Sequence, residues 1–117
     1  MRLIDTSVLI EDVKKGVYEE GAISSITLIE VLCGIAPEKR VMVKELLEKS
    51  YELKSLDNEA ILKYCVLYDA LKEKENLIRD ADLLIASVAI AKNLELMTKD
   101  KDFERQKDLG LKLKLEK

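Results

Sequence analysis

The fold is decided by the stretch Leu3-Ile4-Asp5-Thr6-Ser7-Val8-Leu9-Ile10. Its first residues belong to a short apolar run, 1–5, that ends on an acid and predicts a strand. Residues 8–15 then have the pattern of a helix that Thr6 or Ser7 can cap. The next segment repeats this order, because a strand is predicted over 22–25 and a helical spacing of apolar residues follows it. Two strand-to-helix units in succession indicate a chain of alternating strands and helices.

The rest of the chain continues this alternation. The helix over 80–92 is apolar almost all round, so we expect it to be central and buried. The complete order predicts a single domain over 1–117, with three α/β/α layers and a mostly parallel central sheet. The remaining elements predicted from apolar spacing are helices over 38–50 and 57–74, a helical turn over 102–107, and strands over 51–56, 94–97 and 111–115.

Composition limits the chemistry that this domain can perform. The 117 residues include no His, which excludes Ser/His/Asp triads, Cys/His proteases and His-ligated metal sites. The net charge of −3 provides no global basic field, so a nucleic-acid substrate would need a local basic rim. Any acid–base or metal chemistry must therefore use carboxylates, Lys, Tyr or Cys.

The two cysteines and the longest uncharged runs bear on where the protein works. Cys33 and Cys65 have no CxxC spacing, which is typical of a reducing cytosol and of buried, inert thiols. The longest uncharged runs, 21–29 and 83–91, are well short of the ~20 residues that span a bilayer. We therefore expect a cytoplasmic protein with no membrane partner.

Acidic residues follow the predicted strands at the edge where open parallel sheets bind their ligands, beyond the carboxyl ends of the strands. Asp5 ends the first strand, and Glu30 lies in the helix after the second. Asp100 and Asp102 follow the fourth strand. Asp82 opens the buried helix and joins these acids if that helix starts at the same edge. The sequence leaves this condition open, because the preceding long helix can finish at either end.

A cluster of carboxylates has a chemical consequence. The charges repel one another, which raises some of their pKa values and costs stability unless a cation neutralises them. Mg²⁺ and Mn²⁺ are hard ions that favour oxygen ligands and retain waters. Such an ion lowers the pKa of a bound water, and a pair of ions can stabilise the attacking and leaving oxygens of a phosphodiester displacement. This chemistry needs no His.

Four motifs lie in order along the chain. They are residues 3–10 as quoted above, Ile23-Ser24-Ser25-Ile26-Thr27 leading to Glu30 and Gly34, Asp82-Leu83-Leu84-Ile85-Ala86-Ser87-Val88-Ala89, and Leu96-Met97-Thr98-Lys99-Asp100-Lys101-Asp102-Phe103. Together they resemble the PIN-domain ribonuclease family, and most of all its compact VapC-type toxins of toxin–antitoxin modules. Each motif alone is weak, whereas four in sequence with suitable strand and helix context are strong.

The resemblance implies a Mg²⁺- or Mn²⁺-dependent endoribonuclease that cleaves single-stranded RNA as the toxin of a type II pair. The ligands of one or two ions would then be an acidic quartet formed by Asp5, Glu30, Asp82 and Asp100. Asp102 would assist or replace Asp100, and Thr98 would hydrogen-bond the site or a metal-bound water. The resemblance also implies a homodimer and a cognate antitoxin that covers the site.

Simpler interpretations remain beside this one. Taken singly, Asp5, Asp82 and Asp102 are more often helix caps or first-turn carboxylates than metal ligands. Glu30 fits that interpretation less well, because it follows the helix start and has apolar neighbours.

Two other functions compete for the chain as a whole. A catalytically silent PIN-fold module that binds RNA or a protein is the main alternative, although such a module has no need of a repulsive acid cluster. A phosphoryl-accepting receiver or a phosphatase would need paired acids near the first strand or a DxD turn. Asp5 is instead followed by Thr6 and Ser7.

Overall fold

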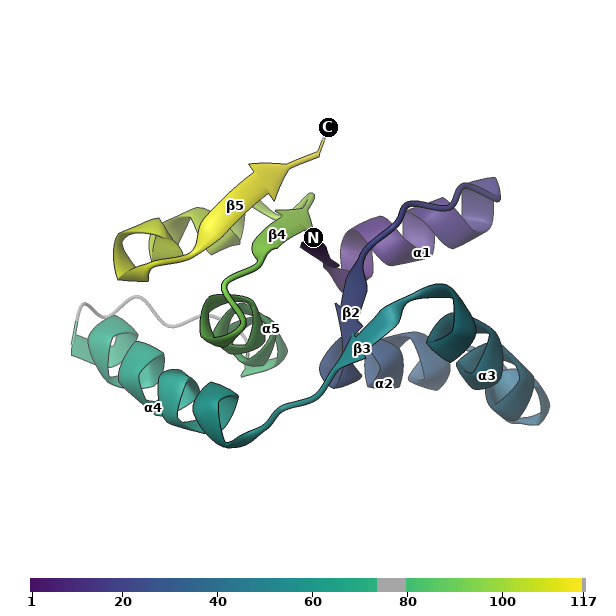
Figure 1. The fold of residues 1–117 in the computed structure, drawn as a ribbon, viewed down its shortest axis with the longest axis horizontal. Helices are drawn as coiled ribbons and strands as arrows, with labels where there is room; N and C mark the ends of the chain where they lie inside the picture. Colours follow the sequence, from purple (N-terminus) through teal and green to yellow (C-terminus); the bar gives the residue numbers. More distant parts are fainter. Residues whose placement is uncertain (74–79, 117) are drawn as a thin grey trace.

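The computed structural model describes residues 1–73 and 80–116, whose strands form one sheet surrounded by helices (Figure 1). The order of the strands is β3-β2-β1-β4-β5, and every pair of neighbours is parallel. The strands are β1 (Arg2–Ile4), β2 (Ala22–Ser24), β3 (Glu52–Lys54), β4 (Glu95–Thr98) and β5 (Lys112–Leu115). The α-helices are α1 (Thr6–Lys15), α2 (Ser25–Cys33), α3 (Arg40–Ser50), α4 (Asn58–Glu73) and α5 (Asp80–Ala91), and the 3-10 helices are η1 (Pro37–Lys39) and η2 (Lys101–Leu109).

Helices cover both faces of the sheet because successive strand residues point to opposite sides. Leu3 of β1 and Leu96 of β4 belong to one core, with α4, α5 and η2. Ile4 and Met97 belong to the other core, with α1, α2 and α3. The two groups of helices lie to the left and right of the view in Figure 1. The predicted three-layer α/β/α architecture is confirmed, and the sheet is parallel throughout the described residues.

Helix α5 lies at the centre of its layer, as its apolar sequence predicts. Asp82, Leu83 and residues 85–89 are buried between the sheet and the neighbouring helix α4. Ser87 adds a polar group to this stretch without cost, since its hydroxyl donates to the carbonyl of Leu83 at 2.7 Å. The first turn of α5, which carries Asp82, therefore has a fixed place in the core.

Helix α4 packs through a narrow stripe. Of its residues only Ala60, Leu67 and Leu71 are buried, and the predicted cap residue Asp57 accepts a hydrogen bond from the amide of Ala60 at 3.1 Å. Cys65 lies outside this stripe and is exposed, as is Cys33 at the end of α2. The expectation that both thiols are buried is wrong, because each lies on the outer side of a helix that buries one face only.

The start of α1 also differs from the prediction. The helix begins at Thr6, and Asp5 occupies the N-cap position, where its side chain makes no capping hydrogen bond. Thr6 and Ser7 are therefore not caps. Their hydroxyls bind two of the carboxylates that the sequence placed at this edge of the sheet.

The bounds of the other elements differ from expectation by a few residues, and the helical turn predicted over 102–107 is the longer 3-10 helix η2. Residue 74, the last residue of the helix predicted over 57–74, lies outside the described residues. Within 1–73 and 80–116, no helix combines the length and the apolar character that crossing a membrane requires.

Candidate active site

Two of the predicted acids lie just beyond the carboxyl ends of neighbouring strands. Asp5 follows β1 and Asp100 follows β4, and these two strands are paired through Ile4 and Met97. The hydrogen bonds between β1 and β4 continue as far as Asp5, whose amide donates to the carbonyl of Met97 at 2.9 Å. The carboxyl ends of β1 and β4 therefore bring segments more than 90 residues apart to one edge of the sheet.

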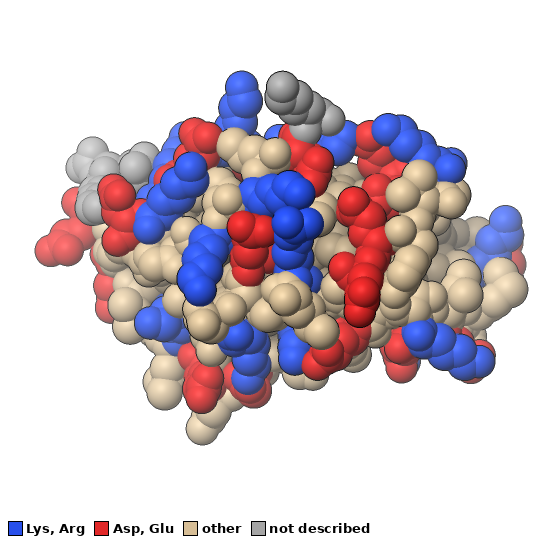
Figure 2. Space-filling view, turned by 45° about the horizontal axis from the view of Figure 1, so that its top comes forward, with Lys and Arg blue, Asp and Glu red and all other residues tan. Residues whose placement is uncertain are grey.

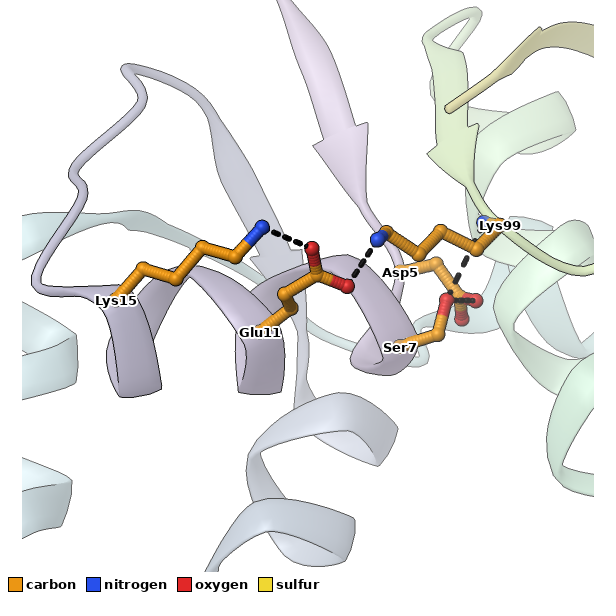
Figure 3. Close-up of polar contacts among 5 residues, drawn as sticks. All are labelled: Asp5, Ser7, Glu11, Lys15 and Lys99. Atoms are coloured by element: carbon orange, nitrogen blue, oxygen red, sulfur yellow. Dashed lines mark hydrogen bonds and ion pairs between the residues drawn. The ribbon is translucent and has the colours of Figure 1, made fainter. Parts of the chain in front are cut away.

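The carboxylate of Asp5 is held by two hydroxyl groups on one of its oxygens. Oδ2 accepts from Thr98 Oγ1 at 2.6 Å and from Ser7 Oγ at 2.9 Å. Ser7 Oγ in turn accepts the amide N–H of Lys99 at 3.3 Å, so that α1 and the loop after β4 meet at this carboxylate (Figure 3). These contacts fix the orientation of the Asp5 side chain.

The other oxygen of Asp5, Oδ1, is buried and has no hydrogen-bond partner among the described residues. A buried carboxylate oxygen without a partner is costly. Burial raises the pKa of Asp5, the hydroxyls of Thr98 and Ser7 and the backbone of Thr6 lower it, and the charge of Asp82 raises it again. The net direction is upward, so the pocket favours either a proton or a cation at this oxygen.

Asp82 belongs to the same site. Its side chain is buried in the first turn of α5, and its charge acts on that of Asp5. Helix α5 therefore starts at the edge where β1 ends, which meets the condition that the sequence left open. A carboxylate in the first turn also interacts favourably with the helix dipole, which offsets part of the cost of burying it.

Glu30 is held by a hydroxyl group of α1. Thr6 Oγ1 donates to Glu30 Oε1 at 2.7 Å and lies 3.0 Å from the hydroxyl of Thr27. Thr27 is itself fixed at the start of α2, where its amide donates to the cap residue Ser24 at 3.1 Å. Thr6 is therefore the hydrogen-bond partner that Glu30 needs among its apolar neighbours.

Asp100 and Asp102 have different surroundings. Asp100 is half-buried, its amide donates to Thr98 Oγ1 at 3.0 Å, and its side chain caps η2 by accepting from the amide of Asp102 at 2.9 Å. Asp102 is exposed and lies 3.9 Å from the guanidinium of Arg105. Of the two, only Asp100 is tied to the hydroxyl that also holds Asp5.

The donors at this edge are suited to a hard divalent cation. Among the described residues, no three acidic or cysteine side chains are grouped as ligands of one ion. Mg²⁺, however, is commonly held by one or two carboxylates together with waters and substrate oxygens. Asp5, with its unpartnered buried oxygen, and the neighbouring Asp82 meet that requirement.

One contact of the site was not foreseen from the sequence. Glu11 of α1 forms ion pairs with Lys15 and with Lys99 (Figure 3). The spacing of Glu11 and Lys15 is a local signal of a helical pair. Nothing in the sequence near Lys99 indicates that it reaches α1, since this pair depends on the pairing of β1 with β4.

This arrangement, in which a parallel sheet carries acids at the carboxyl ends of its central strand β1 and of the neighbouring strand β4, agrees with the family comparison. The chain matches the PIN domain over residues 2–109, and it belongs to the PIN-domain family. The predicted family is confirmed.

The chain is also similar to individual proteins, one by sequence and two by structure. The chain is 44% identical over 115 residues to Ribonuclease VapC1 of Methanocaldococcus jannaschii, and the match covers 95% of this chain and 85% of that protein. Among solved structures, VapBC2 from Rickettsia felis bound to a promoter DNA fragment has a TM-score of 0.84 at 26% identity, covering 99% of this chain and 98% of the other. DNA-bound VapBC from Salmonella typhimurium has a TM-score of 0.83 at 25% identity, covering 97% and 98%.

Proposed function

We propose that this protein is a metal-dependent endoribonuclease that cleaves single-stranded RNA, and that it is the toxin of a type II toxin–antitoxin pair. The observation that carries the proposal is the buried, unpartnered Oδ1 of Asp5 beside the carboxylate of Asp82. Membership of the PIN family and the 44% identity to a ribonuclease support the same reaction. We also propose that the protein acts in the cytoplasm.

Asp5, Glu30, Asp82 and Asp100 would hold Mg²⁺ or Mn²⁺ in this proposal. When bound, such an ion supplies a water of lowered pKa and stabilises the charge that develops on the phosphodiester oxygens. Asp5 would hold the ion through Oδ1, because Oδ2 already accepts hydrogen bonds from the hydroxyls of Thr98 and Ser7. Thr98 is thus a positioning residue that keeps one oxygen of Asp5 directed into the site.

The charge distribution provides little long-range attraction for RNA. Acidic and basic side chains are interspersed on the face drawn in Figure 2, which has no continuous basic surface. With a net charge of −3, long-range attraction of RNA is weak. We therefore expect contacts with the few phosphates next to the cleaved bond to dominate binding, and a modest salt dependence.

An antitoxin is the protein partner that we propose. An apolar groove of about 380 Å³ lies between α1 and α2, lined by Ile10, Val13, Val31 and Ile35, and Glu30 forms part of its wall. A segment with apolar side chains that occupied this groove would reach the site through Glu30. The VapBC structures to which this fold is similar support a partner of this kind.

Cleavage of a circular single-stranded RNA tests the proposed reaction, because a circle has no ends and only an endonuclease can open it. With Mg²⁺ or Mn²⁺ the purified protein is expected to convert the circle to linear products, and excess EDTA is expected to stop the reaction. A fully paired duplex of the same sequence is the control for strand preference. Intact circles under all metal conditions, with RNA or partner binding retained, would favour the silent binding module.

We also propose a homodimer, because two helices expose rows of apolar side chains that the sheet does not cover. Such patches are typical of interfaces. Light scattering at micromolar concentration is expected to give the mass of two chains, and Leu46→Glu or Leu62→Glu is expected to reduce it to one. A single-chain mass for the unmodified protein would contradict the proposal. The exposed residues are Val41, Met42 and Leu46 of α3 and Ile61, Leu62 and Val66 of α4.

A further inference from the structure

Glu11 connects two lysines from distant parts of the chain. Lys15 follows it by one helical turn in α1, whereas Lys99 comes from the loop between β4 and η2, 88 residues away. Hydrogen bonds from Lys15 and Lys99 lower the pKa of Glu11 to about 2, so the carboxylate is charged at neutral pH. The long-range pair is the more sheltered of the two, because the side chain of Lys99 is 29% exposed and that of Lys15 is 62% exposed.

Lys99 is placed between two residues of the candidate site. Thr98, before it, donates to Asp5, and Asp100, after it, donates its amide to Thr98. The amide of Lys99 itself donates to Ser7 of α1. The loop after β4 is therefore joined to α1 at two points, through the backbone of Lys99 to Ser7 and through its ammonium group to Glu11 (Figure 3).

We propose that Glu11 and Lys99 form a positioning pair, whose ion pair holds the loop after β4 against α1 and so keeps Thr98 and Asp100 in register with Asp5. This inference rests on the proposed nuclease function. Neither residue needs to touch the substrate. The pair acts by limiting the movement of the loop at Lys99, where the other direct contact with α1, the backbone hydrogen bond from Lys99 to Ser7, is long.

The obvious competing role for Lys99 is contact with an RNA phosphate, and Glu11 separates the two roles. If Lys99 binds phosphate, the carboxylate of Glu11 competes with RNA for it, so Glu11→Gln would strengthen RNA binding. If the two residues position the loop, Glu11→Gln releases Lys99 and slows cleavage. Glu11→Gln therefore strengthens RNA binding if Lys99 binds phosphate, whereas it slows cleavage if the two residues position the loop.

Single-turnover and steady-state cleavage of a short RNA should therefore be measured for Glu11→Gln, Lys99→Met and the double variant. Positioning predicts that kcat falls about tenfold in each, with KM changed less than about twofold, because displaced groups lose transition-state stabilisation. The double variant is expected to be no slower than either single variant, since the two residues act as one unit. Lys99→Arg keeps the cation and is expected to restore most of the rate.

Matched controls come from α3, where Lys44 and Glu48 form an exposed pair of the same kind. Lys44→Met and Glu48→Gln make the same changes of charge and are expected to leave kcat unchanged. Hydrogen exchange provides a readout that does not depend on activity. The amide of Lys99 is expected to exchange faster in Glu11→Gln than in the unmodified protein, because its bond to Ser7 opens more often.

The outcomes are distinguishable. An unmodified protein that cleaves no RNA overturns the proposed function, and the positioning role fails with it. If the unmodified protein cleaves RNA and Glu11→Gln cleaves equally fast, the positioning role alone is overturned. Tighter RNA binding by Glu11→Gln, or unchanged exchange at Lys99, overturns it as well.

Discussion

Asp5→Asn is expected to reduce metal-dependent RNA cleavage by orders of magnitude while making the metal-free protein more stable. The amide retains an oxygen that can accept from Thr98 and Ser7, but it removes the negative charge whose buried oxygen has no partner. The proposed ion then loses a ligand, and the water that it would activate is lost with it. Stability moves the other way because a buried charge is costly and that of Asp82 repels it.

The gain in stability should depend on pH with a defined sign. Because the pKa of Asp5 is raised in the folded protein, the folded state holds this proton more tightly than the unfolded chain does. Ionised Asp5 therefore costs stability above the ordinary pKa of 3.8, and the cost grows as pH rises through the folded value. Thermal melts without metal are expected to show a higher Tm for Asp5→Asn at neutral pH, and a difference that vanishes at lower pH.

Asp82→Asn is also expected to reduce metal-dependent cleavage by orders of magnitude. The double variant is expected to be little less active than either single variant, because the two carboxylates act as a unit. Asp69→Asn, an exposed acid of α4, is the control for a lost charge away from the site. Full metal-dependent cleavage by the purified Asp82→Asn protein would show that Asp82 is a first-turn carboxylate and not a metal ligand.

Addition of Mg²⁺ or Mn²⁺ is expected to raise the Tm of the unmodified protein, because the ion binds only the folded arrangement and relieves the repulsion between Asp5 and Asp82. At a concentration of 100 times Kd the gain corresponds to about 2.7 kcal/mol. Asp5→Asn should lose most of this shift. Ca²⁺ is expected to raise the Tm without supporting cleavage.

Differential scanning calorimetry with and without millimolar metal measures this effect. A nonspecific action of salt is controlled by NaCl at equal ionic strength. An unchanged melting curve with both Mg²⁺ and Mn²⁺ would contradict the binding of these ions by the acidic quartet, even if RNA cleavage were observed.

Sequence reasoning located the acids because their positions follow from topology. Parallel strands place their carboxyl ends at one edge, so Asp5 and Asp100 were expected at the same edge once their strands were recognised, and the structure adds that these strands, β1 and β4, are neighbours. The central place of α5 followed from its lack of a polar face. Glu30 and Asp82 have no strand directly before them, so the sequence placed Asp82 at this edge only on the condition that its helix starts there, and the resemblance to PIN domains implied that both are metal ligands.

The roles of the hydroxyl groups were harder to predict for a physical reason. Thr6 and Ser7 precede a helix, and from sequence a cap and a side chain that binds a carboxylate look the same. The choice between them depends on where Glu30 and Asp5 lie in three dimensions. Exposure of Cys65 was missed for a related reason, since the width of the buried stripe on α4 is set by packing against α5.

The position of β1 in the middle of the sheet has a consequence for the synthesis of this protein on the ribosome. The strand that leads to Asp5 is made early, but one of its two neighbours, β4, and the hydroxyl of Thr98 come 93 residues later. A nascent chain that has not reached Lys99 and Asp100 has neither the second ladder of β1 nor the loop that meets α1. A chain that stops before this point therefore cannot assemble the site, so any activity that depends on the site can begin only after β4 and the loop that follows it have been made.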